Sequence, residues 1–160
     1  MSLLHTLARY KAWADELLYG AIAKAPPDLL TAPQPIVFGN LLRTLNHVHA
    51  MDQVWQAHLQ GRPHGLTTRN PESPPFDVLR ETQTRMDAWY IDYARHLSGP
   101  AAEEVVHFTF IGGGAGAMSR GDILLHVVNH ATYHRGHVAD MLYRAGLNPP
   151  TTDLPVFLRA

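Results

Sequence analysis

The feature that most constrains the fold is a set of four segments in which apolar residues recur every three or four positions. This period is typical of an amphipathic helix that buries one face. The segments run over about 2–24, 40–61, 75–98 and 119–145. Four such helices, without strands enough for a sheet, predict an all-α four-helix bundle. At 160 residues the chain can build one hydrophobic core, so we expect a single domain, 1–160.

One short stretch departs from the helical pattern. Residues 105–111 have the composition of a β-strand, but they are few, and we expect the stretch to be isolated. The glycine-rich run 112–116 follows as a flexible turn and lacks the Lys-Ser/Thr of a phosphate-binding loop. The tail 147–160 carries three prolines and several apolar residues, which we expect to dock on the body.

Charge and composition exclude several classes of protein. The net charge is −1 and the basic residues are scattered, so no nucleic-acid partner is expected. No stretch approaches the roughly 18 apolar residues of a membrane span, and the first residues do not resemble a signal peptide. We therefore expect a cytoplasmic protein. The chain has no cysteine, which leaves histidine and carboxylate side chains as the available metal ligands.

Two of the 11 histidines, His130 and His134, lie one turn apart in the fourth segment. On a helical wheel they share the apolar face with Ile123, Val127, Val138 and Met141. Polar rings that face a core need partners, because an unsatisfied buried polar group costs about 1–3 kcal/mol. A shared metal ion would satisfy both rings, and so would hydrogen bonds within a metal-free bundle. The pair lacks the internal Glu of a zincin protease motif.

The second segment offers His47, His49 and Asp52 as further ligands. His47 and His49 lie on opposite sides of its apolar face, each roughly 100° from the centre, so the wheel does not choose between them. Asp52 lies inside the apolar stripe, where it would be a ligand, would orient a ligating imidazole, or would reach solvent at the helix margin. His126 and His137, at the edge of the fourth segment's face, would support the site or be exposed.

Several motifs together resemble the DinB/YfiT-like family of proposed metal-dependent enzymes. The resemblance covers nearly the whole chain. It rests on the opening 10–14, the run 38–55, the run 125–136 with the sequence His-Ala-Thr-Tyr-His-Arg-Gly, and the ending 153–155. One departure is His137, which stands where the family usually has Gln.

The resemblance implies a four-helix bundle with a long crossover connection and a homodimer. It also implies a divalent metal ion, zinc or nickel, bound by His47, His130 and His134. The resemblance thus favours His47 over His49 as the third ligand.

The resemblance further implies a thiol-dependent transferase, in which a low-molecular-weight thiol such as bacillithiol, mycothiol or glutathione attacks a small electrophilic substrate. A metal-dependent hydrolase is the alternative enzyme, and a non-catalytic bundle that binds metal or a small ligand is the alternative outside catalysis. An acid or base beside the metal would favour an enzyme, and the candidates are Asp52, Tyr133 and His137.

Overall fold

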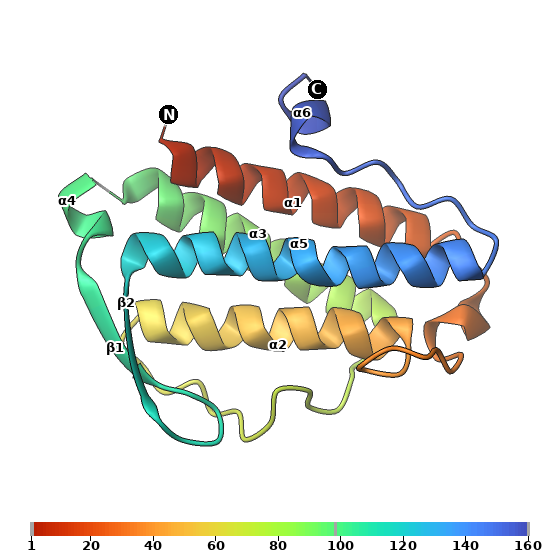
Figure 1. The fold of residues 1–160 in the computed structure, drawn as a ribbon, viewed down its shortest axis with the longest axis horizontal. Coiled ribbons are helices and arrows are strands. Elements are labelled where there is room, and N and C mark those ends of the chain that lie inside the picture. Colours follow the sequence, from red (N-terminus) through yellow and green to blue (C-terminus); the bar gives the residue numbers. More distant parts are fainter. Residues whose placement is uncertain (1, 98, 160) are drawn as a thin grey trace.

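Four long helices form a bundle in the computed structural model, which describes residues 2–97 and 99–159 (Figure 1). The helices are α1 (Leu3–Ile22), α2 (Leu41–Leu59), α3 (Phe76–His96) and α5 (Arg120–Arg144). α1 packs against α3 and α5, and α2 packs against the same two helices. The predicted all-α four-helix bundle is confirmed.

The connection between α2 and α3 spans the length of the bundle. Figure 1 shows that α2 and α3 run in the same direction, so the segment 60–75 returns from one end of the bundle to the other. This segment is the long crossover connection that the family resemblance implied. The connection between α1 and α2 contains a short 3-10 helix, η1 (Pro27–Leu30).

The ends of the long helices follow from local capping chemistry. Ser2, Asn40 and Ser119 each precede a helix with extended backbone, and each side chain accepts a hydrogen bond from the amide three residues later. Gly61 and Gly146 follow the ends of α2 and α5 with φ of 65° and 74°. Glycine adopts this left-handed conformation without steric cost, which allows the chain to leave the helix.

A β-hairpin connects the short helix α4 (Gly99–Ala102) to α5. Strand β1 (Val105–Thr109) pairs antiparallel with β2 (Ala115–Ser119), with Val105 opposite Ser119. The expectation of an isolated strand-like stretch was therefore wrong. Its partner strand, Ala-Gly-Ala-Met-Ser, has none of the β-branched residues that mark a strand in a sequence. At one of these positions the structure requires glycine, because a Cβ on Gly116 would lie 2.7 Å from the Cζ atom of Phe108.

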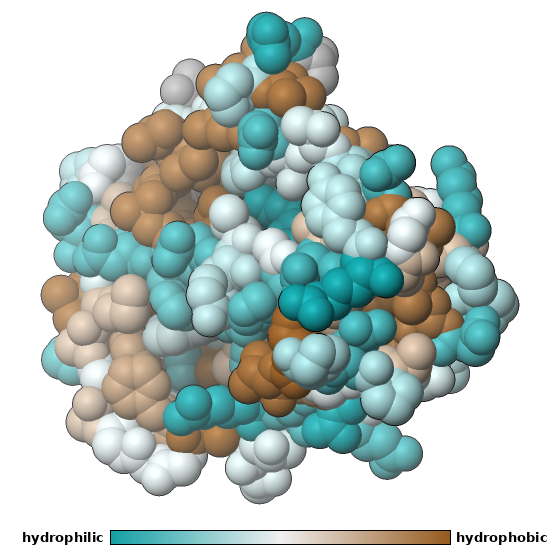
Figure 2. Space-filling view, turned by 45° about the vertical axis from the view of Figure 1, so that its right-hand side comes forward, coloured by the Kyte–Doolittle hydropathy of each residue, from teal (hydrophilic) through white to brown (hydrophobic). Residues whose placement is uncertain are grey.

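The C-terminal tail docks on α1, as expected. It ends in the short helix α6 (Leu154–Phe157), and the Phe157 ring lies 5.5 Å from the Trp13 ring, centroid to centroid. Figure 2 shows that hydrophobic side chains on one face of the molecule form separate patches with polar residues between them. Among the described residues, no helix is both long and apolar enough to cross a bilayer.

Candidate metal centre

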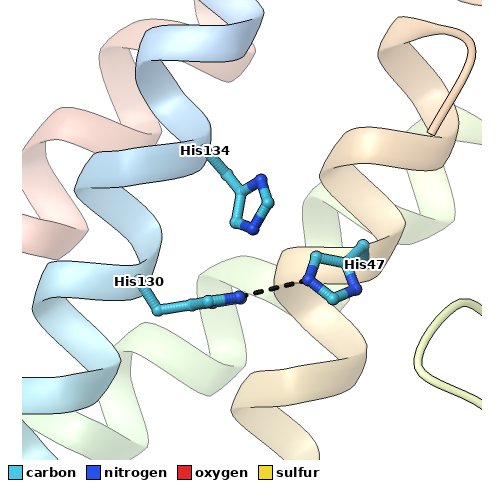
Figure 3. A group of neighbouring side chains, drawn as sticks. All are labelled: His47, His130 and His134. Atoms are coloured by element: carbon cyan, nitrogen blue, oxygen red, sulfur yellow. Dashed lines mark hydrogen bonds between the residues drawn. The ribbon is translucent and has the colours of Figure 1, made fainter. Parts of the chain in front are cut away.

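Three imidazole rings meet between α2 and α5, which pack against each other. His47 projects from α2, and His130 and His134 project from successive turns of α5 (Figure 3). One nitrogen from each ring lies within 4.8 Å of the others. His47 and His134 are buried and His130 is half-buried. We call these residues the three-histidine cluster.

The spacing of the three-histidine cluster fits a metal ion. Zinc–nitrogen bonds of about 2.0–2.1 Å in a tetrahedral site place two ligand nitrogens about 3.3–3.4 Å apart. The Nε2 atoms of His47 and His130 are 3.1 Å apart, and a ring nitrogen of His134 points toward the gap between them (Figure 3). Only small side-chain movements would bring the three nitrogens into a common coordination shell. Zinc and nickel both accept imidazole ligands.

The rings of the cluster are held in the neutral form that binds metal. Burial, reinforced by the neighbouring imidazoles, lowers the pKa of His130 to about 3 and that of His134 to about 4. Burial also lowers the pKa of His47. A neutral imidazole keeps a lone pair for a ligand bond. At neutral pH each ring can therefore offer one lone pair to a metal ion without losing its single remaining ring proton.

A backbone carbonyl orients His47. Its Nδ1 atom lies 2.7 Å from the carbonyl oxygen of Arg69 in the crossover segment, so Nδ1–H donates and the Nε2 lone pair faces the cluster. Phe38 stacks on the same ring, with centroids 4.1 Å apart. Hydrogen bonding of the far imidazole nitrogen is a recurrent feature of histidine metal ligands, because it fixes the tautomer and the ring orientation.

In the metal-free form this arrangement also sets the tautomer of His130. Since Nε2 of His47 is an acceptor, Nε2 of His130 must donate across the 3.1 Å contact. The Nδ1 atom of His130 is then a bare acceptor, and it is buried without a hydrogen-bond partner among the described residues. A metal ion on Nε2 would move the proton to Nδ1 and would remove the need for the His47–His130 hydrogen bond.

Two of the three acid–base candidates lie beside His134. The Nδ1 atom of His137 is 3.2 Å from the Nδ1 atom of His134, and the Tyr133 ring lies 5.0 Å from the His134 ring and 4.6 Å from the His137 ring. Tyr133 is 63% exposed. His137 is half-buried at the outer side of the cluster, where it can orient His134.

The structure places Asp52 away from the cluster. Its carboxylate is fully buried, 2.8 Å from the Nζ atom of Lys11, and it accepts a hydrogen bond from Gln83. It therefore neither contacts a cluster imidazole nor reaches solvent. Gln83 also contacts Nδ1 of His49 at 2.8 Å, so the imidazole that Asp52 helps to orient is that of His49.

Neither His49 nor His126 joins the three nitrogens. His49 contacts Gln83 through Nδ1 and Gln53 through Nε2, so both of its ring nitrogens are occupied on the opposite side of α2 from His47. His126 stacks on His130 at 5.8 Å and lies 4.8 Å from the Trp55 ring. It borders the cluster without offering a nitrogen within ligand distance of all three.

Sequence reasoning missed a buried ion network behind the cluster. The Nζ atom of Lys11 lies 2.9 Å from Asp15, 2.8 Å from Asp52 and 2.5 Å from Asp87. A signal was available, since Lys11 falls on the helical stripe between Leu7 and Ala14, where a charge needs partners. The carbonyl of Arg69 left no such signal, because a backbone group is common to every residue.

Comparisons with known proteins agree with this architecture. The DinB family model matches residues 1–160. The chain is 23% identical to protein DinB of Bacillus subtilis (strain 168) over 159 residues, which cover 95% of this chain and 91% of that protein. A crystal structure of a DinB-like protein from Bacillus cereus ATCC 10987 superposes with a TM-score of 0.69 at 16% identity, covering 89% of this chain and 91% of the other. Together with this match, the three-histidine cluster between α2 and α5 fits a metal-binding protein. The chain belongs to the DinB family.

Proposed function

We propose that this protein is a divalent-metal-dependent enzyme that transfers a low-molecular-weight thiol to a small electrophilic substrate. The observation that carries the proposal is the convergence of three neutral imidazoles from two packed helices. Histidines that only filled a core would be expected to satisfy their own nitrogens. Here one nitrogen from each of the three rings faces the same point between the helices, and the Nε2 atoms of His47 and His130 lie 3.1 Å apart.

His47, His130 and His134 would hold the ion, zinc or nickel. With three protein ligands, such an ion supplies an open coordination position at which a thiol or a water molecule loses its proton at neutral pH. The protein's own groups set the geometry. The Arg69 carbonyl accepts a hydrogen bond from Nδ1 of His47, and Nδ1 of His137 contacts Nδ1 of His134. His137 and Tyr133 contact His134 and each other, and both reach the surface, so these two side chains would carry a proton to or from the site.

Metal content is the first test. Protein purified without a histidine tag is analysed by plasma mass spectrometry beside His47→Ala, His134→Ala and the control His96→Ala, whose imidazole is exposed on α3. We expect about one divalent ion per chain in the parent and the control, and a loss of that ion in both cluster variants. The absence of metal from the parent, with none taken up on titration, would contradict the proposal.

Activity then separates the reactions. The metal-loaded protein is incubated with an electrophilic chloroarene and with glutathione, bacillithiol or mycothiol, and the thioether product is followed by absorbance. Thiol-dependent product that disappears in His134→Ala supports the transferase. A parallel incubation offers an ester without any thiol, and hydrolysis of that ester would instead identify the hydrolase. Bound metal without turnover of the chloroarene or the ester would identify a binding protein.

A metal-free bundle makes a different prediction. The His47–His130 hydrogen bond would then be the native use of the cluster. Chelator would leave the melting temperature of the purified protein unchanged. For the metal site we expect the melting temperature to fall when the ion is removed, because a ligand that binds only the native state stabilises it.

The homodimer implied by the family resemblance stays a prediction. Light scattering coupled to size-exclusion chromatography measures the mass directly. A mass of twice the 17.8 kDa of the chain supports the dimer, and the mass of a single chain contradicts it.

A further inference from the structure

A cavity of about 450 Å³ lies along α2 beyond the three-histidine cluster. Its volume is in the range of sites that bind small molecules. The wall consists of one face of α2, the crossover segment and the tip of the β-hairpin. The lining residues are Met51, Val54, Trp55, His58, Arg69, Phe110, Ile111, Gly112 and Gly113.

The cavity begins one helical turn from the cluster. Met51 follows His47 by four positions on α2, so the two side chains lie on the same face of the helix. Arg69 takes part in both sites, since its carbonyl oxygen accepts the hydrogen bond from His47 while its side chain lines the cavity. A ligand that contacts the Arg69 side chain therefore lies next to the residue that orients a metal ligand.

A second contact joins the cavity to the other helix of the cluster. The ring of Trp55, in the cavity wall, lies 4.8 Å from the ring of His126 on α5. His126 in turn stacks on His130, with centroids 5.8 Å apart. None of the three cluster histidines lines the cavity, but one intervening residue joins the two on each helix, Arg69 to His47 and His126 to His130.

The charge of the lining is positive. Arg69 carries a full charge at neutral pH, and no residue of the lining is acidic. Within the described part of the chain, the Arg69 guanidinium forms no hydrogen bond or ion pair, and the residue is exposed. Burial, with a smaller contribution from His64, lowers the pKa of His58, so this ring stays neutral. The rest of the wall is mostly aromatic and aliphatic.

We propose that this cavity binds a substrate of the metal site, and that this substrate is a small molecule with an apolar body and a carboxylate group. The apolar body would lie against Trp55 and Phe110, and the carboxylate would pair with the guanidinium of Arg69, whose planar donors match a carboxylate. The role as a substrate site rests on the proposed function, whereas the binding of a carboxylate can be measured without metal or turnover.

The test uses 3-phenylpropionate and its uncharged analogue 3-phenylpropionamide as probes. Their binding to metal-free protein in chelator is measured by titration calorimetry for the parent, Arg69→Gln and the control Arg62→Gln. Arg62 is exposed in the same crossover segment, and its guanidinium contacts Gln56 and Gln60 outside the cavity. The parent should bind the carboxylate about five- to tenfold more tightly than the amide. Arg69→Gln should abolish this preference, and Arg62→Gln should retain it.

Equal binding of the two probes by the parent, or an unchanged preference in Arg69→Gln, would overturn the proposal. A carboxylate preference in a protein that takes up no metal would instead refute the proposed function and leave the anion site standing. A second arm repeats the titrations with zinc-loaded protein and 3-phenyl-2-sulfanylpropionate. If zinc tightens binding of this thiol relative to 3-phenylpropionate, the carboxylate belongs to the thiol cosubstrate. If zinc has the same effect on both, the carboxylate does not belong to the thiol cosubstrate.

Discussion

Replacing Lys11 by Met is expected to be the most destabilising single change outside the apolar core. The Lys11 side chain is 1% exposed, and its ammonium contacts the carboxylates of Asp15, Asp52 and Asp87. Burial lowers the pKa of Lys11, but the three carboxylates outweigh that effect and raise it well above its ordinary value. Met has a similar length and fills the same space, so the substitution removes the charge with little change in packing.

The size of the expected stability loss follows from the cost of protonating the buried carboxylates once the Lys11 ammonium is absent. Burial already raises the pKa of Asp87 to about 7, so this group can take up a proton near neutrality. Asp52, which is fully buried, must then also be neutralised. Protonating a carboxyl of ordinary pKa 3.9 costs about 4 kcal/mol at pH 7 and about 1.5 kcal/mol at pH 5. The value at pH 7 agrees with the 3–5 kcal/mol typical of breaking a buried ion pair.

The assay is urea unfolding of metal-free protein, followed by tryptophan fluorescence, at pH 7 and pH 5. Lys11→Met should lower the free energy of unfolding by about 4 kcal/mol at pH 7 and by about 1.5 kcal/mol at pH 5. The loss is smaller at pH 5 because the buried carboxyl, once it has no cation beside it, has a raised pKa in the folded state. A group whose pKa is raised on folding stabilises the folded state as the pH falls. Lys24→Met, at the exposed lysine after α1, is the matched control and should change stability by less than about 0.5 kcal/mol. A loss below about 1 kcal/mol at pH 7, or an equal loss at both pH values, would refute the reasoning.

Three further predictions concern the cluster, a helix cap and the hairpin. The pKa of folded His130 is lowered to about 3, so its neutral form stabilises the fold above about pH 6.5, and this contribution is lost as the pH falls. In chelator, the stability of the parent relative to His130→Gln should therefore drop by about 1 kcal/mol between pH 7.5 and 5. A difference that stays constant over this range would contradict the lowered pKa. Asn40→Ala removes the hydrogen bond from the Arg43 amide and should cost about 1 kcal/mol in urea unfolding, whereas Asn40→Asp should retain most of the stability. Gly116→Ala would press a methyl group against the buried Phe108 ring and should cost about 1–3 kcal/mol, and an unchanged melting temperature would show that the ring moves freely.

The hairpin shows where local sequence information ends. The strand-like composition of β1 was visible in the sequence, but its pairing with β2 was not, because Ala, Gly and Ser have no preference for strands. Gly116 faces the Phe108 ring, and the need for a small residue there arises only when the two strands meet. A residue chosen by its cross-strand neighbour cannot be recognised as part of a strand from its own properties.

The sequence by itself determined the four long helices and the placement of His130 and His134 on one face of α5, because helical periodicity depends on residues within four positions of one another. The helical wheel left His47 and His49 equivalent and the family resemblance favoured His47. The tertiary structure brings His47 to the pair, since the two lie on opposite sides of the apolar stripe of α2 and the packing of α2 on α5 selects the side. It likewise placed Lys11 among three carboxylates and the Arg69 carbonyl behind His47. These contacts join segments far apart in the chain, so they exist only after the helices have packed and the crossover has closed over them.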